Sequence, residues 1–327
     1  MRHITILGCG LSGTTFAKKV RELDADIKIT LIDKNPYFIN RWEFFDTFDF
    51  KRQLDLAKFA AEINAEFICD TLERVNVKRQ KIYFKDKECR DYETLVVAAG
   101  IKPKKIAVKG EHREGFFYFA GFDAVSMRDR IQILSDAVIY LSTILGVKLC
   151  LNLRRQKKDV NIIAGNLDFL GEKKEQFLNY CARENVGVYH NVTMEEAIGE
   201  ATVRAVKLNP LKVLSAQALF LDTGFATNND FFESEGDHAI ANPAEAANVH
   251  IIGSCSNNAI SDDHFFANEA INSTRQALWL AEKLFTGGEQ VDFMPEKEYN
   301  PHLIIEELFL KYNVLPVNTN TAPVNQE

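Results

Sequence analysis

Short apolar runs and one helical stretch alternate at the start of the chain. Residues 3–7 and 27–32 are apolar enough to form buried strands, and the stretch between them has the character of a helix. Asp33 closes the second run. A strand, a helix and a strand in this order predict a βαβ unit, in which the two strands are parallel.

The apolar pattern extends this first unit to about Lys105. Residues 94–100 form an almost continuous apolar run that ends in glycine, which is typical of a strand covered on both faces of its sheet. Residues 34–45 are expected to form an aromatic loop, and apolar positions at helical spacing predict a helix over 54–63. Short strands are expected at 66–69, 72–77 and 81–85.

A second series of strands and helices follows and repeats the pattern of the first. Residues 218–224 repeat the apolar run that ends in glycine, and a further buried strand at 249–255 precedes a long helix beginning at Asp262 or Asp263. Alternation of this kind predicts an α/β fold. The other expected elements are strands at 136–142, 159–164 and 187–190, and helices at 146–156, 172–184 and 301–312.

Composition narrows the class of protein. The 327 residues, with 46% apolar and 26% charged side chains, suit a two-domain globular protein, and no apolar run approaches the ~20 residues of a membrane helix. The chain enters a strand without the apolar core of a signal peptide, so we expect a cytoplasmic protein with no integral membrane segment. A net charge of −7 argues against nucleic acid as a partner. The six cysteines include no C-x-x-C pair, which argues against a disulfide framework or a zinc site.

The turn after the first strand has the glycine spacing of a dinucleotide-binding loop. Gly8 permits a tight turn, Gly10 lets the backbone approach a pyrophosphate, and Gly13 lets the following helix pack closely on the strand. The N-terminus of that helix offers free N–H groups to phosphate oxygens. Asp33 is placed to accept hydrogen bonds from a ribose. The alternative is an ordinary turn between a strand and a helix, with an exposed aspartate.

Three motifs in order resemble the flavoproteins of the pyridine nucleotide–disulfide oxidoreductase family, over residues 1 to about 290. The glycine loop with Asp33 is similar to the family's site for the ADP half of FAD, and residues 94–100 resemble its T-x-x-x-A-T-G strand. Residues 251–255 resemble the strand whose closing Gly-Asp reaches the ribitol of FAD, with Ser254 in place of the aspartate. A neutral hydrogen bond is weaker than a charge-assisted one, so Ser254 would reduce FAD affinity. Without an adjacent dithiol, the chain resembles rubredoxin and ferredoxin reductases and type II NADH dehydrogenases more than disulfide reductases.

The resemblance implies a flavin site in the first unit. A cation near the flavin ring would stabilise its anionic character, which makes Lys34 and Arg41 candidates; the alternative is that each is a solvated loop cation. No catalytic residue is assigned and no metal is expected. The residues expected to bind FAD are Gly8, Gly10, Leu11, Ser12, Gly13, Asp33, Lys34, Arg41, Ala98, Ala99, Gly100, Gly253 and Ser254.

The second series departs from the family where a nicotinamide dinucleotide would bind. Aligned on Gly146, the first two glycines of the loop are replaced by Leu141 and Thr143, and a β-carbon at Thr143 would occupy the space of the pyrophosphate. A glutamate common in the family is replaced by Lys148, and Ala164 begins the segment where an acid is expected. NAD(P)H binding in the usual mode is therefore doubtful. The alternative is a domain that keeps its fold without this ligand.

Some reactive and aromatic side chains could lie near the flavin, although core packing or a structural role is the favoured interpretation for the cysteine and the aromatic residues. Cys255 precedes a helix, whose N-terminus would lower the thiol pKa, and the alternative is a buried structural cysteine. His264 could face the flavin ring. The aromatic side chains that could cover the ring or pack in the core are Trp42, Phe44, Phe45 and Phe48.

Together these features predict a FAD-binding Rossmann-like domain with a second Rossmann-like domain inserted. The expected boundaries are 1–108 and 226–290 for the FAD domain, 109–225 for the insertion and 291–327 for a C-terminal helix and tail. The tail helix is expected to pack on its own domain or on the partner of a homodimer.

The main functional hypothesis is a FAD-dependent oxidoreductase that passes electrons from a nicotinamide nucleotide through the flavin to a redox protein, a quinone or another small acceptor. The first alternative is a FAD-binding electron-transfer or binding subunit that has lost nicotinamide binding. The second is a dehydrogenase that holds NAD(P) alone in the first glycine loop.

Overall fold

The computed structural model describes residues 3–49, 53–86, 88–165, 167–232, 246–256, 267–286, 293 and 301–314. The chain divides into two compact units, each formed from separate stretches of sequence. Unit 1 comprises Met1–Phe44, Asp49–Lys102 and Phe225–Tyr299, and unit 2 comprises Phe45–Phe48, Pro103–Gly224 and Asn300–Glu327. The α/β fold predicted from the sequence is confirmed.

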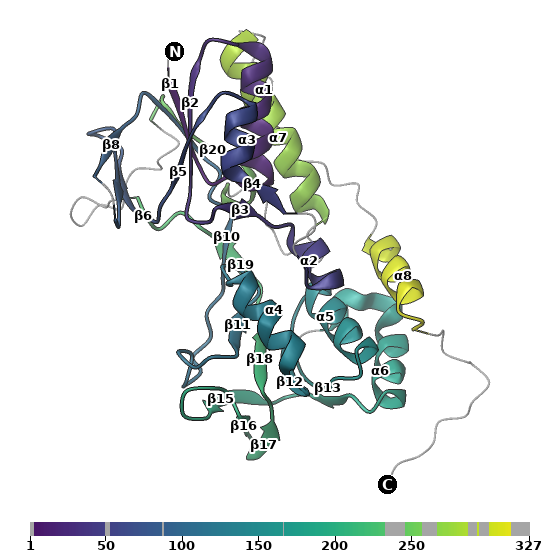
Figure 1. Ribbon diagram of the computed structural model, residues 1–327. Coiled ribbons are helices and arrows are strands. Elements are labelled where there is room, and N and C mark those ends of the chain that lie inside the picture. Colours follow the sequence, from purple (N-terminus) through teal and green to yellow (C-terminus); the bar gives the residue numbers. More distant parts are fainter. Residues whose placement is uncertain are drawn as a thin grey trace. The chain divides into compact units, whose positions relative to one another are not determined.

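Unit 1 is built on a five-stranded parallel sheet (Figure 1). All four residues of the strand Thr94–Val97 are buried, as predicted for a strand covered on both faces, and it lies between two other strands of the sheet. The strands follow the order β20-β9-β1-β2-β5 and span Val249–Ile251, Thr94–Val97, His3–Leu7, Lys28–Asp33 and Glu66–Cys69.

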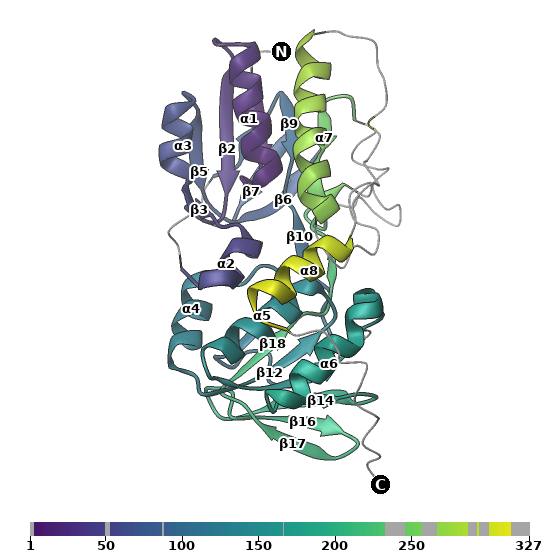
Figure 2. The same ribbon diagram turned by 90° about the vertical axis from the view of Figure 1, so that its right-hand side faces the viewer.

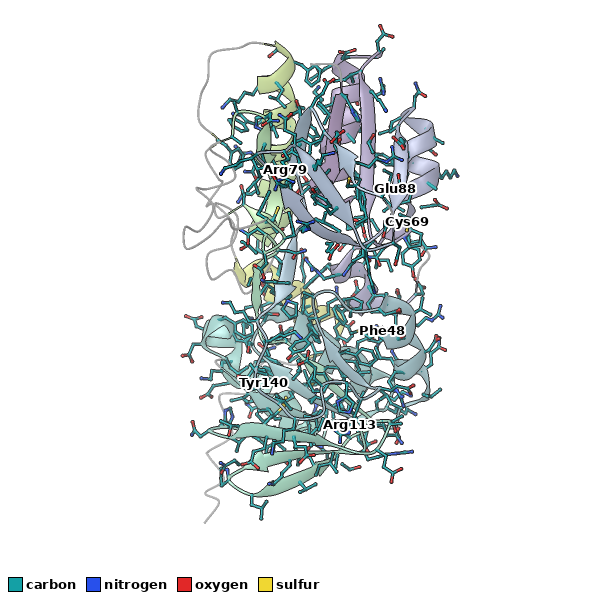
Figure 3. The ribbon with its side chains drawn as sticks, turned by 90° about the vertical axis from the view of Figure 1, so that its left-hand side faces the viewer. Phe48, Cys69, Arg79, Glu88, Arg113 and Tyr140 are labelled. Atoms are coloured by element: carbon teal, nitrogen blue, oxygen red, sulfur yellow. The ribbon has the colours of Figure 1, made fainter. Side chains whose placement is uncertain are left out.

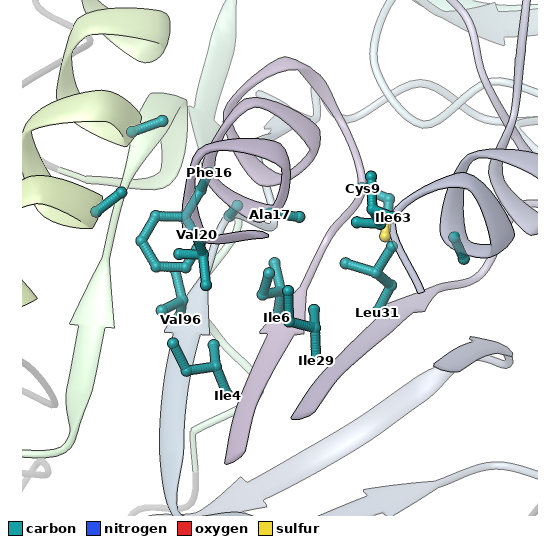
Figure 4. Close-up of a cluster of buried hydrophobic side chains, with 14 of the residues drawn as sticks. Ile4, Ile6, Cys9, Phe16, Ala17, Val20, Ile29, Leu31, Ile63 and Val96 are labelled. Atoms are coloured by element: carbon teal, nitrogen blue, oxygen red, sulfur yellow. The ribbon is translucent and has the colours of Figure 1, made fainter. Parts of the chain in front are cut away.

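Helices cover one face of this sheet, where α1 (Leu11–Leu23), α3 (Leu56–Glu62) and α7 (Ala267–Thr286) lie together in two perpendicular views (Figures 1 and 2). Phe16 and Val20 of α1 belong to one buried cluster with Ile4, Ile6 and Val96 of the sheet (Figure 4). Side chains alternate between the faces of a strand, so the neighbouring residues Leu7, Leu95 and Val97 point to the opposite face. A small antiparallel sheet covers that face, with strands β6 (Leu72–Asn76), β7 (Lys81–Phe84) and β8 (Arg90–Asp91).

The segment predicted as an aromatic loop is partly regular, so that prediction is wrong. A short strand β3 (Tyr37–Phe38) pairs with β4 (Leu54–Asp55), and a helix α2 spans Arg41–Thr47. Asn40 explains the start of the helix, because its side-chain oxygen accepts a hydrogen bond from the Trp42 N–H at 3.0 Å and its carbonyl accepts one from the Phe44 N–H at 2.9 Å.

Unit 2 repeats the architecture with a second five-stranded parallel sheet in the order β11-β18-β12-β13-β14. A three-stranded antiparallel sheet, which the sequence pattern did not predict, shares a buried cluster with one face of it. Helix α4 (Ala124–Ile133) begins at Asp123, whose carboxylate accepts from the Ser126 N–H at 2.9 Å. The parallel strands span Phe116–Tyr118, Ala218–Leu221, Asp136–Leu141, Asp159–Ala164 and Gly187–Tyr189; the antiparallel strands β15, β16 and β17 span Thr193–Ile198, Ala205–Asn209 and Lys212–Ser215; helices α5 and α6 span Ile144–Arg155 and Lys174–Arg183. Short strands β10 (Ile101–Pro103) and β19 (Phe225–Thr227) form a two-stranded pair.

Two small segments complete unit 2. The side chain of Phe45 is fully buried and its ring lies 4.7 Å from that of Phe119. The tail helix α8 (Pro301–Lys311) packs on its own unit, since the ring of Phe309 stacks at 6.3 Å on that of Phe177 in α6. Of the two surfaces expected for this helix, the structure shows its own domain. None of the helices in the described part of the chain combines the length and apolarity needed to cross a bilayer.

Candidate functional site

The turn between β1 and α1 is held by two glycines that the protein's own packing requires. Gly8 has φ of +93°, and a β-carbon there would lie 2.3 Å from the carbonyl oxygen of Ala98. A β-carbon at Gly13 would lie 2.0 Å from the carbonyl oxygen of Gly8. Real β-carbons do not approach backbone atoms so closely, so both positions need glycine for the turn to close against the strand end. We name the residues 8–13 together with Ala98 the unit 1 corner.

Gly10 differs from these two glycines because none of the described residues crowds the position of its β-carbon. A β-carbon at Gly10 would meet only the ring edge of Phe38, at 3.9 Å. Gly10 is also the N-cap residue of α1, and no side chain caps that helix end. The first turn of α1 therefore has no side-chain cap and begins beside a residue without a side chain, which is the arrangement that suits a phosphate group.

Asp33 completes the unit 1 corner from the end of β2. One of its carboxylate oxygens accepts a hydrogen bond from the Cys9 N–H at 2.8 Å, and the other accepts from the Asn35 N–H at 2.9 Å. Each carboxylate oxygen can accept a further hydrogen bond, and the residue is only partly buried. Asp33 can therefore receive ribose hydroxyls while its position is fixed by the backbone. Its neighbour across the sheet is Cys69 of β5, whose exposed side chain is labelled in Figure 3.

The other two expected motifs lie at the carboxyl ends of neighbouring strands. Gly100, which follows β9, has φ of +69°, and a β-carbon there would meet no atom within 4 Å. Gly253, which follows β20, packs against the first motif, because its β-carbon would lie 2.1 Å from Oγ of Ser12. Its N–H donates to the side-chain oxygen of Gln276 in α7 at 2.7 Å. Ser254 is buried in the short 3-10 helix that begins at Gly253.

The remaining expected FAD contacts lie around these motifs. Leu11 is 39% exposed in the first turn of α1, Ala98 is buried and Ala99 is partly buried. Lys34 has an exposed side chain, in agreement with a solvated loop cation. The Arg41 guanidinium lies over the ring of Phe225, 5.6 Å from its centroid.

Two cysteines near this site, Cys9 and Cys255, are buried. Cys255 is buried, and its thiol donates to the carbonyl oxygens of Ile252 at 3.1 Å and Val97 at 3.3 Å. Burial raises the pKa of Cys255 to about 11, which agrees with a buried structural cysteine and not with a thiol activated by a helix N-terminus. Burial likewise raises the pKa of Cys9, whose side chain lies in the core shown in Figure 4. His264 lies outside the described residues.

The aromatic side chains expected near the flavin serve mainly as core. Phe44, Phe45 and Phe48 are buried, and Phe45 and Phe48 belong to unit 2. Trp42 is partly buried.

The equivalent corner of unit 2, which comprises residues 141–146 and Asp222, is filled by side chains. Thr143 is the N-cap of α5 and is almost completely buried. The fully buried Asp222, directly after β18, accepts hydrogen bonds from the N–H groups of Ser142 at 3.1 Å and Thr143 at 2.6 Å, and from the hydroxyl of Thr143 at 2.8 Å. Tyr140, labelled in Figure 3, is the neighbouring residue of β12 whose carbonyl accepts from the Asp222 N–H at 2.9 Å.

Burial is the main influence on the pKa of the Asp222 carboxyl group. Removal from water raises its pKa from 3.8 to about 6, and the hydrogen bonds from Thr143, Ser142 and Gly146 act in the opposite direction. Sequence reasoning missed this residue. The available signal was an acid inside an otherwise apolar run, since Leu221-Asp222-Thr223-Gly224 stands where the first unit has Val97-Ala98-Ala99-Gly100.

Lys148, found where the family often has a glutamate, has a structural partner. Its side chain is 1% exposed, and its ammonium nitrogen lies 3.0 Å from the carboxylate of Asp46. The neighbouring Asn152 donates to the carbonyl oxygens of Phe45 and Asp46, each at 2.9 Å. Helix α5 therefore holds the short segment 45–48 within unit 2.

Comparison with known proteins agrees with this geometry. A sulfide-quinone reductase of Aquifex aeolicus (strain VF5) is 28% identical over 110 residues, which cover 31% of this chain and 25% of the relative. The apoptosis-inducing factor 3 of Mus musculus is 25% identical over 247 residues, which cover 72% of this chain and 40% of the relative. The chain thus spans well under half the length of these curated relatives.

The fold is shared with a solved structure that contains a reductase. The covalent putidaredoxin reductase–putidaredoxin complex gives a TM-score of 0.72 at 15% identity, over 90% of this chain and 79% of that chain. The family model described as pyridine nucleotide-disulphide oxidoreductase matches residues 2–243. Because it covers well over half of the chain, this match shows that the chain belongs to the pyridine nucleotide-disulphide oxidoreductase family.

Proposed function

We propose that this chain is a FAD-dependent oxidoreductase that passes electrons from a nicotinamide nucleotide through the flavin to an acceptor. The observation that carries the proposal is the unit 1 corner. Gly10 has open space where a β-carbon would be, the end of α1 has no side-chain cap, and Asp33 is fixed at the end of the neighbouring strand. These are the features that a dinucleotide requires of a protein.

The residues of unit 1 fit FAD. The N–H groups at the start of α1 would hold its pyrophosphate, Asp33 its adenosine ribose, and Ser254 its ribitol. The bare backbone at Gly100 leaves room for a ligand at the end of β9. Once bound, FAD would supply a redox centre that the side chains of this site do not themselves provide.

A small redox protein or a quinone is the acceptor that the relatives favour. One similar fold was solved as a complex of a reductase with putidaredoxin, and one curated relative is a sulfide-quinone reductase. A cytoplasmic location and a homodimer remain predictions, which cell fractionation and light scattering would test.

A second candidate function keeps the flavin and replaces the electron donor. The observation that favours it is the unit 2 corner, where Leu141, Thr143 and Asp222 fill the space that a pyrophosphate would need. In this case a reduced partner protein or another donor would deliver electrons to the flavin.

The absorption spectrum of the purified full chain tests both candidates. We expect flavin bands, and anaerobic addition of NADH or NADPH at sub-millimolar concentration should bleach them if the first candidate is correct. Bands that neither nucleotide bleaches, but that dithionite bleaches, would select the second candidate. A colourless protein that does not take up added FAD would contradict both.

A further inference from the structure

We propose that Asp222 takes the place of a dinucleotide phosphate at the N-terminus of α5, so that unit 2 does not hold NAD(P)H by its pyrophosphate. The inference concerns unit 2 alone and does not depend on flavin binding by unit 1. It identifies the acidic residue that, together with Leu141 and Thr143, fills the unit 2 corner.

The two corners are equivalent position by position. In unit 1, Leu7 of β1 pairs with Val97, and the carbonyl of Leu7 accepts from the Ala98 N–H at 2.7 Å. In unit 2, Tyr140 of β12 pairs with Leu221, and the carbonyl of Tyr140 accepts from the Asp222 N–H at 2.9 Å. Asp222 therefore stands where unit 1 has Ala98. Counting from the same pairs, Leu141, Thr143 and Gly146 stand where unit 1 has Gly8, Gly10 and Gly13.

The carboxylate of Asp222 uses the donors that a phosphate would use. It accepts from the N–H groups of Ser142 and Thr143 and from the hydroxyl of Thr143, and the Gly146 N–H also points to it. The hydroxyl oxygen of Thr143 accepts from the Leu145 N–H at 3.2 Å. Helix N-termini attract anions through these N–H groups and through the helix dipole, and here a side chain of the same unit supplies the anion.

The side chains of Asp222 and Leu141 also fill the space that a pyrophosphate would need. A β-carbon at Gly146 would lie 2.5 Å from the Asp222 carboxylate and 3.0 Å from Cγ of Leu141. Gly146 is therefore bare because Asp222 packs against it, whereas the equivalent Gly13 is bare because the turn of Gly8 passes over it. Both Leu141 and Asp222 are fully buried. A pyrophosphate could enter only by displacing a buried carboxylate and a leucine side chain.

The filled unit 2 corner affects how a nicotinamide electron donor would bind. Without a clamp for the pyrophosphate, the ADP half of NADH contributes little to binding. Reduced nicotinamide mononucleotide lacks the ADP half. If a nicotinamide reduces the flavin, we expect this mononucleotide to reduce it within about threefold of the NADH rate at equal concentration, because the missing half adds little binding energy.

Calorimetric titration with ADP-ribose tests the inference directly. The protein is the full chain carrying Gly10→Val, whose side chain closes the unit 1 corner so that the titration reports unit 2; chain saturated with FAD serves the same purpose if this variant does not fold. We expect no binding at ~1 mM ADP-ribose. Binding of one equivalent with a dissociation constant below ~100 µM would overturn the inference.

Substitution of Asp222 gives the converse test. In Asp222→Ala the α5 N-terminus loses its anion, and we expect inorganic phosphate to raise the unfolding temperature of this variant by several degrees more than that of the wild type. The matched control is Asp159→Ala, which removes an exposed carboxylate of the same unit, and phosphate should affect it as it affects the wild type. An equal effect of phosphate on Asp222→Ala and on the control would contradict the proposed role of the carboxylate. A variant that does not fold leaves the ADP-ribose titration as the decisive test.

Discussion

Units 1 and 2 both lead from a parallel strand into a helix at the equivalent corner, yet side chains fill the corner of unit 2, whereas Gly10 leaves that of unit 1 without one. In unit 1 the residue after the neighbouring strand is Ala98, and the helix end beside Gly10 is uncapped. In unit 2 the same position is Asp222, whose carboxylate occupies the helix end. The comparison teaches that a Rossmann-like fold does not by itself specify a ligand, because a side chain on an adjacent strand can occupy the position of a ligand phosphate.

The largest expected effect comes from breaking the ion pair between Lys148 of α5 and Asp46. It tests whether Lys148 has a structural role rather than a ligand-binding role. Asp46→Ala removes the carboxylate that faces the buried Lys148 and also pairs with Lys311 at 2.6 Å. Because losing the anionic partner of a buried cation is costly, we expect the free energy of unfolding to fall by about 3 kcal/mol in a urea titration. Lys148→Met removes the charge together with its need for a partner and should cost far less. Equal losses in both variants would show that the ion pair is not what holds residues 45–48.

The next effect concerns the pH dependence that only the unit 2 corner should show. The folded-state pKa of Asp222 is raised from 3.8 to about 6, so between these values the unfolded chain loses this proton while the folded chain keeps it. The stability contributed by this group is therefore present at low pH and lost as the pH rises to about 6, by about 3 kcal/mol.

Urea unfolding of the wild type and Asp222→Ala at pH 4 and pH 7 measures this difference. The advantage of the wild type over the variant should be larger at the lower pH. An advantage that is the same at both pH values would contradict the raised pKa of Asp222 in the folded chain.

The third effect tests the open space in unit 1. Gly10→Val places a branched side chain where only Phe38 lies nearby, so the fold should tolerate it while a pyrophosphate should not. We expect the affinity for FAD to fall by about 100-fold or more, measured by quenching of flavin fluorescence on binding. An unfolding temperature of the flavin-free variant close to that of the wild type controls for misfolding. Unchanged flavin affinity would place the cofactor elsewhere.

The smallest effect concerns the serine that replaces the family's aspartate. Ser254→Asp restores a charged acceptor in the 3-10 helix after β20, and a charge-assisted hydrogen bond to a ribitol hydroxyl should raise FAD affinity by about fivefold. Ser254→Ala removes the acceptor and should weaken binding. If both substitutions change the affinity in the same direction, Ser254 does not contact the ribitol.

The sequence predicted the elements whose patterns are local. The buried strand before Gly100, the helix capped by Asp55 and the first glycine loop all lie where the apolar runs and glycines indicated. The same patterns indicated that Leu141 and Thr143 would crowd the second loop, and the structure shows both buried there.

The features that the sequence did not predict depend on contacts between distant residues. Asp222 reaches the start of α5 from a position 79 residues further along the chain, and the short segment 45–48 joins unit 2 through Asn152, 107 residues from Phe45. No local periodicity encodes such contacts. The raised pKa of Cys255 also depends on burial, which residues distant in the sequence create.

The stoichiometry of ADP-ribose binding to the flavin-free full chain tests the contrast between the two corners most directly, because this fragment carries the pyrophosphate and ribose groups that FAD and NAD(P)H share. We predict one equivalent per chain, fully displaced by FAD. Two equivalents, or one that FAD does not displace, would show that the unit 2 corner admits a pyrophosphate beside Asp222 and would contradict the distinction between the two units.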